Sequence, residues 1–122
     1  MKIRIQNVRL VQDGQIRPVT LLVDGEKIAA VLPKGTQPDA DQVIDGKGQF
    51  LSHGFIDIHT HGGGGHDFMD GTEEAYLEAA RMHAAHGTTG LAVTTLAASK
   101  EEILDSFAVY ERVKGKSQGA RL

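Results

Sequence analysis

One apolar segment that ends in two histidines restricts the fold of this chain more than any other feature. Residues 55–61 read Phe-Ile-Asp-Ile-His-Thr-His and run directly into four glycines. This density of aromatic and β-branched residues predicts a buried β-strand. Because side chains alternate faces along a strand, His59 and His61 share one face, with Asp57 one layer deeper. The chain should therefore present two imidazoles together at the end of a strand.

Two imidazoles on one face of a strand end make up half of a divalent-metal site. The chain has no cysteine, so a metal must be held by histidine and carboxylate groups. Catalytic zinc usually has three protein ligands and a water, so at least one further ligand must come from elsewhere. We predict His59 and His61 as metal ligands, against the alternative of two structural histidines. Asp57 is placed to orient an imidazole or to pair with a cation.

The loop after the histidines combines glycines with polar residues that can reach a ligand. Glycine lets a backbone turn sharply and approach a ligand closely. The loop lacks the Gly-Lys-Ser/Thr end of a Walker loop and the spacing of a dinucleotide fingerprint. We predict a substrate loop beside the metal, with a phosphate cradle, a lid hinge or an ordinary solvated βα loop as alternatives. The predicted loop residues are Gly62, Gly63, Gly64, Gly65, His66 and Asp67.

Two patterns of secondary structure follow one another along the chain. Residues 1–50 alternate short apolar runs with Asp-Gly turn pairs, which predicts a small antiparallel β domain. Residues 51–122 read strand, helix, strand, helix, with one helix capped by Thr72 and the other opened by a capping box of Ser99 and Glu102. This order is typical of a parallel sheet with crossover helices. Two such units cannot close a barrel, so we expect both domains to be incomplete.

Charge and hydropathy exclude several classes of partner. The net charge of −3 and the pI near 6.0 give no electrostatic reason to expect nucleic acid or an anionic membrane as partner. The N-terminus has no apolar stretch of the kind found in a signal peptide, and no run approaches the roughly 18 apolar residues of a membrane span. We therefore expect a cytoplasmic protein.

Several motifs resemble one family of enzymes. Residues 51–63, Leu-Ser-His-Gly-Phe-Ile-Asp-Ile-His-Thr-His-Gly-Gly, resemble the first barrel strand of the amidohydrolase superfamily of metal-dependent hydrolases. Residues 24–48 are similar to its small N-terminal β domain. Residues 62–71 and 86–96 look like the N-acetylglucosamine-6-phosphate deacetylase family. The sequence departs from the family at His53, where proline is more common.

The resemblance implies an α/β fold, the N-terminal part of a (β/α)8 barrel preceded by a small antiparallel β domain. Residues 1–50 would be the incomplete β domain and residues 51–122 the first two βα units of the truncated barrel. His59 and His61 would hold a divalent metal, zinc or iron, in the complete enzyme. The other ligands and the proton-transferring aspartate would lie outside these residues, so the resemblance implies no catalytic residue here and no activity for the fragment alone.

The activity implied by the resemblance is deacetylation of N-acetylglucosamine 6-phosphate to glucosamine 6-phosphate and acetate, a step of amino sugar metabolism. The metal would activate a water molecule and polarise the amide carbonyl. The implied partners are the amino-sugar phosphate and further copies of the chain in a homo-oligomer. Two alternatives stay open: a non-catalytic metal-binding or assembly module, and another amidohydrolase such as a dihydroorotase-like enzyme.

Overall fold

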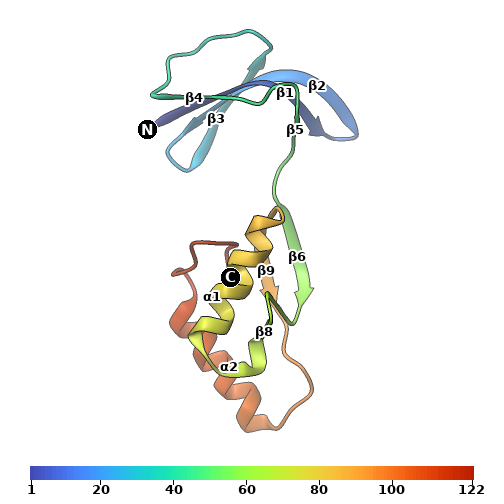
Figure 1. Cartoon of the computed structure of the whole chain (residues 1–122), viewed down its shortest axis with the longest axis vertical. Helices are drawn as coiled ribbons and strands as arrows, with labels where there is room; N and C mark the ends of the chain where they lie inside the picture. Colours follow the sequence, from blue (N-terminus) through green and yellow to red (C-terminus); the bar gives the residue numbers. More distant parts are fainter. The chain divides into compact units, whose positions relative to one another are not determined.

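The computed structural model describes residues 1–122, which form two compact units, Met1–His53 and Gly54–Leu122 (Figure 1). The boundary lies three residues beyond the one expected from the sequence. The difference arises because Phe50 and Leu51 form a short strand, β5, that pairs with the first strand of the chain.

The first unit is one five-stranded mixed sheet. Strands β1 (Lys2–Gln12), β2 (Gln15–Asp24) and β3 (Lys27–Pro33) form an antiparallel meander through the expected turns. Strands β4 (Gln42–Asp45) and β5 (Phe50–Leu51) pair with β1 in parallel. The prediction of an antiparallel domain is therefore wrong for these two strands.

The segment 34–41 explains the parallel pairing. It carries the chain back to the start of β1, where the Asp41 amide donates to the Lys2 carbonyl at 2.9 Å. Arg4 Nη1 donates to the Pro38 carbonyl at 3.1 Å and so fixes the same segment to the sheet. Parallel strands need such a crossover, whereas a two-residue hairpin can join only antiparallel ones.

An irregularity in β1 places the core of the first unit on one face. The pairing of β1 with β2 shifts register between Ile5 and Val8, and Asn7 within this bulge has φ 54°. The extra residue lets Ile5 and Val8, three positions apart, pack in the same cluster. Buried Leu10 and Val19 belong to the same cluster, and Leu51 packs against it.

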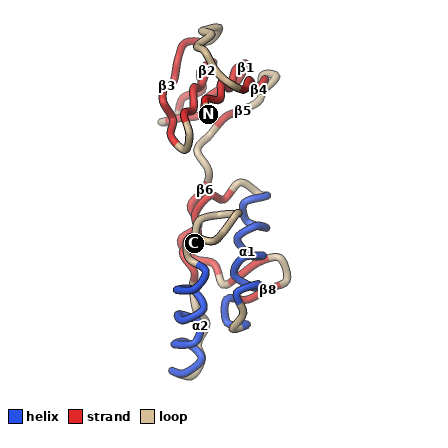
Figure 2. The backbone as a smooth tube through the Cα atoms, turned by 90° about the vertical axis from the view of Figure 1, so that its left-hand side faces the viewer, coloured by secondary structure: helices blue, strands red, loops and turns tan.

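The second unit is a parallel strand pair with two helices (Figure 2). Strands β6 (Phe55–Thr60) and β9 (Thr88–Val93) are joined through helix α1 (Glu73–Ala85), and helix α2 (Lys100–Val113) follows β9. Between β6 and α1 lie the short antiparallel strands β7 (Gly62–Gly63) and β8 (His66–Asp67) and the 3-10 helix η1 (Phe68–Asp70). The strand–helix order agrees with the sequence pattern, and the chain contains no closed barrel.

Helices α1 and α2 enclose the main core of the second unit. Its buried residues are Phe68, Tyr76, Ala79, Val109 and Val113. The Tyr76 hydroxyl donates to the Ser106 carbonyl of α2 at 2.9 Å, and burial raises the pKa of this tyrosine. Neither helix is long and apolar enough to cross a lipid bilayer.

Strand β6 is more exposed than its sequence predicts. Ile56 and Ile58 are 75% and 80% exposed, so the expectation of a buried strand is wrong on this face. The cause is the placement of α1, which packs chiefly against β7, β8 and β9. Strand β6 has a paired neighbour on one edge only.

Candidate metal centre

The two histidines of the motif converge at the C-terminal end of β6. His59 is the second-last residue of β6, and His61 directly follows the strand. Their Nε2 atoms are 3.3 Å apart, and the rings meet edge to face with centroids 5.1 Å apart and planes at 78°. The two rings therefore lie on one side of the chain, as the alternation of side chains in a strand predicts.

The neighbouring strand fixes the tautomer of His61. The Nδ1 atom lies 3.1 Å from the carbonyl oxygen of Thr94, just beyond the end of β9. A carbonyl oxygen only accepts, so Nδ1 must carry the ring proton. Nε2 of His61 is then left with a lone pair, the form in which imidazole binds a metal.

The role of Thr94 was not assigned from the sequence. The threonine side chain does not indicate this contact, because the backbone carbonyl of Thr94 binds His61. The parallel pairing supplies the reason for the contact: the Thr94 amide donates to the Thr60 carbonyl at 2.9 Å, which continues the β6–β9 ladder past the strand ends. The residue beside the strand-end histidine is thus set by the register between the two strands.

Asp57 acts on the backbone of the histidine segment. Its Oδ1 accepts from the backbone amide of His59 at 3.0 Å. The expectation that this carboxylate orients an imidazole ring is therefore not what the structure shows. The bond instead holds the main chain at His59, one residue before the end of β6.

The separation of the two nitrogens fits a single bound metal. Two nitrogens at 2.0–2.1 Å from one tetrahedral zinc lie about 3.3–3.4 Å apart, and the observed Nε2–Nε2 distance is 3.3 Å. Imidazole nitrogen suits zinc, iron and similar divalent ions. No group of three or more His, Cys, Asp or Glu side chains in the chain is arranged to hold a metal.

The glycine segment forms a small hairpin directly after His61. Gly62 pairs with Asp67 and Gly63 with His66, and the Phe68 amide donates to the His61 carbonyl at 2.8 Å. This bond joins the far end of the hairpin to the main chain of His61.

The polar residues of the hairpin have structural partners. Asp67 caps η1, where its Oδ1 accepts from the Met69 amide at 2.7 Å and its own amide donates to Asp70 Oδ2 at 2.9 Å. His66 Nδ1 lies 3.8 Å from Asp70 Oδ2. Asp67 therefore fixes the exit of the hairpin, and the substrate role expected for the segment 62–67 stays a prediction.

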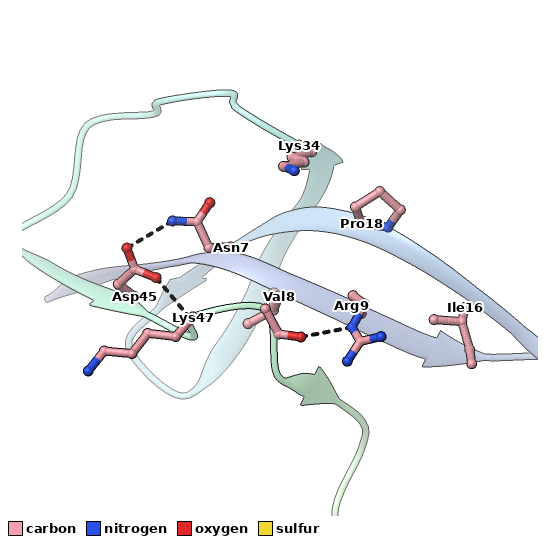
Figure 3. A pocket seen from close by; sticks show the side chains of 9 residues that line it. Asn7, Val8, Arg9, Ile16, Pro18, Lys34, Asp45 and Lys47 are labelled. Carbon is pink, nitrogen blue, oxygen red and sulfur yellow. Dashed lines mark hydrogen bonds between the residues drawn. The ribbon is translucent and has the colours of Figure 1, made fainter.

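A separate hollow lies in the first unit (Figure 3) and contains none of the predicted site residues. Its volume is about 620 Å³. Its polar groups largely bind one another: Asp45 accepts from Asn7 Nδ2 at 2.8 Å and from the Lys47 amide at 2.9 Å, and these bonds lower the pKa of the Asp45 carboxyl. Arg9 donates to the Gly48 carbonyl at 2.8 Å and stacks on Phe50. These contacts stabilise the turn between β4 and β5.

The chain is similar to several hydrolases. No protein-family model matches it. A dihydroorotase from Staphylococcus aureus is 35% identical over 57 residues, which are 47% of this chain and 13% of that protein. The crystal structure of N-acetylglucosamine-6-phosphate deacetylase from Pasteurella multocida superposes with a TM-score of 0.89 at 27% identity, over 100% of this chain and 33% of that one. Dihydropyrimidinase from Brevibacillus agri gives 0.63 at 33% identity, over 96% and 25%.

These similar proteins are all hydrolytic amidohydrolases, in agreement with the resemblance of the motifs. The chain spans about a third of the length of the solved deacetylase. The comparisons support a hydrolase family and leave open which member of it this chain represents.

Proposed function

We propose that this chain contributes part of the active site of a metal-dependent amide hydrolase, with His59 and His61 as two of the metal ligands. The observation that carries the proposal is the 3.3 Å separation of the two Nε2 atoms, together with the Thr94 carbonyl that leaves the His61 nitrogen unprotonated. The same spacing also allows a hydrogen bond between the two rings, so metal binding rather than the distance alone must distinguish the proposal from a structural histidine pair.

The chemistry of such a site divides between the metal and the chain. A divalent metal lowers the pKa of a water molecule and polarises the carbonyl of the amide to be cleaved. The chain orients the ligands: the Thr94 carbonyl holds the proton of His61 on Nδ1, and Asp57 holds the backbone amide of His59. The proton that reaches the departing amine comes from a group outside these contacts.

We propose N-acetylglucosamine 6-phosphate as the substrate, with hydrolysis of its acetamide bond to give glucosamine 6-phosphate and acetate. The superposition of the whole chain on a deacetylase with this substrate in its name supports the choice. The residues 62–67 would then form the substrate loop, because glycines without side chains allow a sugar to approach the main chain closely. In solution we propose a homo-oligomer.

A dihydroorotase-like activity is the second candidate, and it is supported by the 35% identity to a dihydroorotase. Both enzymes cleave an amide bond, and both readings use the same histidine pair. They differ in the substrate, which is an acyclic acetamide in the first case and a ring amide in the second. A non-catalytic assembly module remains the alternative in which the histidines bind metal without turnover.

Metal binding to the chain tests the proposal directly. We expect isothermal titration with Zn²⁺ to show one site per chain, lost in His59→Ala and in His61→Ala. His86→Ala is the matched control, because His86 lies at the end of α1 and its ring bonds only within that helix, to the Met82 carbonyl at 2.9 Å. Equal zinc binding by all four proteins would refute the assignment.

The substrate is tested by release of product in the presence of Zn²⁺. Acetate from N-acetylglucosamine 6-phosphate and ring opening of dihydroorotate are measured on this chain and on a version extended past Leu122. Acetate release confined to the extended version supports the deacetylase. Turnover of dihydroorotate alone supports the second candidate, and a stoichiometric complex without turnover supports the assembly module.

A further inference from the structure

We propose that His83 is a positioning residue that ties the metal-binding segment to helix α1. It holds the carbonyl of Gly62, the residue that directly follows the ligand His61. The inference extends the proposed function, since it concerns the metal site assigned there. It adds a residue that belongs to neither the histidine motif nor the glycine loop.

Two donors, His83 and Thr60, share the carbonyl oxygen of Gly62. His83 Nε2 lies 3.0 Å from the Gly62 oxygen and 3.4 Å from Thr60 Oγ1. The Thr60 hydroxyl itself donates to the Gly62 oxygen at 3.1 Å. A carbonyl oxygen has two lone pairs and only accepts, so both are used here and His83 must carry its proton on Nε2.

The glycine hairpin packs closely against α1 beside this bond. An added Cβ at Gly63 would overlap Met82 Cε and lie 3.0 Å from His83 Nε2. The glycine hairpin therefore rests directly on α1 at two consecutive helix residues. A side chain at position 63 would require the end of the Met82 side chain to move.

Three bonds from three different elements then surround His61. Its ring is held by the Thr94 carbonyl beyond β9, and its own carbonyl accepts from the Phe68 amide of η1. The tie from His83 on α1 fixes the next residue along the chain. Without it, the Gly62 carbonyl would keep the bond from the Thr60 hydroxyl but lose its bond from α1, so His61 could move relative to that helix.

Four proteins of 122 residues test this role: the wild type, His83→Leu, His83→Gln and His86→Leu. Leucine removes the donor and keeps bulk, while glutamine restores an amide donor at a similar reach. His86→Leu removes a histidine from the same helix that does not reach the hairpin. Amide hydrogen exchange is measured at Phe68, whose amide bonds to His61, and Zn²⁺ affinity is measured by titration.

We expect His83→Leu to raise the exchange rate at Phe68 about tenfold, the factor typical of one lost hydrogen bond. Zinc binding should weaken about tenfold, at the lower end of the range for loss of an outer hydrogen bond at a metal site. His83→Gln and His86→Leu should stay within about twofold of the wild type. A change in His83→Gln equal to that in His83→Leu would overturn the proposal, because packing rather than the bond would then be responsible.

The tautomer of His83 gives a test that needs no variant. Long-range ¹H–¹⁵N spectra of the wild type should show the proton on Nε2, and a proton on Nδ1 would overturn the proposal even if His83→Leu failed to fold. The metal result separates the two proposals. Wild-type protein that binds no zinc but shows the expected exchange pattern contradicts the proposed function and supports the tie. If zinc binding depends on His59, but His83→Leu changes neither the exchange rate at Phe68 nor the zinc affinity, only the proposed role of His83 is contradicted.

Discussion

Substitution of Gly62 by alanine should disrupt the candidate site more than any other glycine change in the hairpin. Gly62 has φ 154°, which side chains rarely adopt, and an added Cβ would overlap the carbonyl oxygen of His66 and lie 2.8 Å from the Cα of Asp67. Both of these atoms belong to β8, the strand that Gly62 pairs with. The methyl group would therefore push apart the two strands that close the hairpin onto His61.

The size of the effect follows from two separable costs. A residue with a side chain in this region of φ costs about 1–3 kcal/mol. Overlap with fixed backbone atoms adds about 1–3 kcal/mol, as in an overpacked core. Gly65 provides the matched control, because its φ of 87° is also positive but its added Cβ would meet no atom within 4 Å. Gly65→Ala should therefore carry the first cost without the second.

Tyrosine fluorescence during urea unfolding measures both variants. The only two tyrosines, Tyr76 and Tyr110, lie on α1 and α2 of the second unit, so the signal reports the unit that contains the hairpin. We expect Gly62→Ala to lower the free energy of unfolding by about 2–6 kcal/mol and Gly65→Ala by about 1–3 kcal/mol. A larger loss in Gly65→Ala would refute the reasoning, since steric overlap at β8 would then not decide the outcome.

Three further substitutions probe the packing, the helix start and the exposed strand. Tyr76→Phe should cost about 1 kcal/mol in urea unfolding, because it removes the buried hydroxyl bonded to Ser106. Since burial raises the pKa of Tyr76, its contribution is complete below the unfolded value of 10.0 and is lost as the pH rises above it; the phenylalanine variant should lack this alkaline loss. Ser99→Ala should bring the lowered pKa of Glu102 back up toward its ordinary value in an NMR titration, because the serine hydroxyl and amide both donate to that carboxylate; an unchanged value would contradict the capping box. Ile58→Thr should shift stability by no more than about 0.5 kcal/mol and reduce self-association in sedimentation velocity, because this isoleucine is 80% exposed.

The convergence of the histidine pair could be predicted because it depends on local geometry alone. Side chains two residues apart in a strand share a face whatever surrounds the strand, so His59 and His61 had to meet. The groups that support the pair could not be found in this way. Thr94 depends on the register between β6 and β9, and His83 depends on the rotation of α1 about its axis. Both contacts depend on how separate elements pack together, and the spacing of residues within one segment does not predict that packing.

The direction of β4 and β5 was hidden for a similar reason. The Asp-Gly pairs at 13–14 and 24–25 identify hairpins correctly, because a two-residue turn forces the next strand to run antiparallel. The segment 34–41 also carries turn residues but is long enough to bring the chain back to the start of β1. The segment 46–49 carries turn residues too, yet β4 and β5 on either side of it pair in succession along β1 in one direction. A short apolar run has no feature that distinguishes parallel from antiparallel pairing, so composition could not decide between them.

The two histidines of the proposed metal site differ in how firmly the surrounding chain holds them. His61 is held through its ring, its carbonyl and the next residue, whereas the ring of His59 has its hydrogen-bond contact with His61 itself. A side chain that is already in place loses little rotational freedom on binding a metal, so in the proposed site the ordering cost would fall mainly on His59. Parallel strands end at one edge of their sheet, and β6 is paired on one side only. A third ligand at the C-terminal end of another parallel strand would complete the set of three protein ligands that catalytic zinc usually has. The contacts that hold His61 would keep its nitrogen in a fixed position while the other ligands bind.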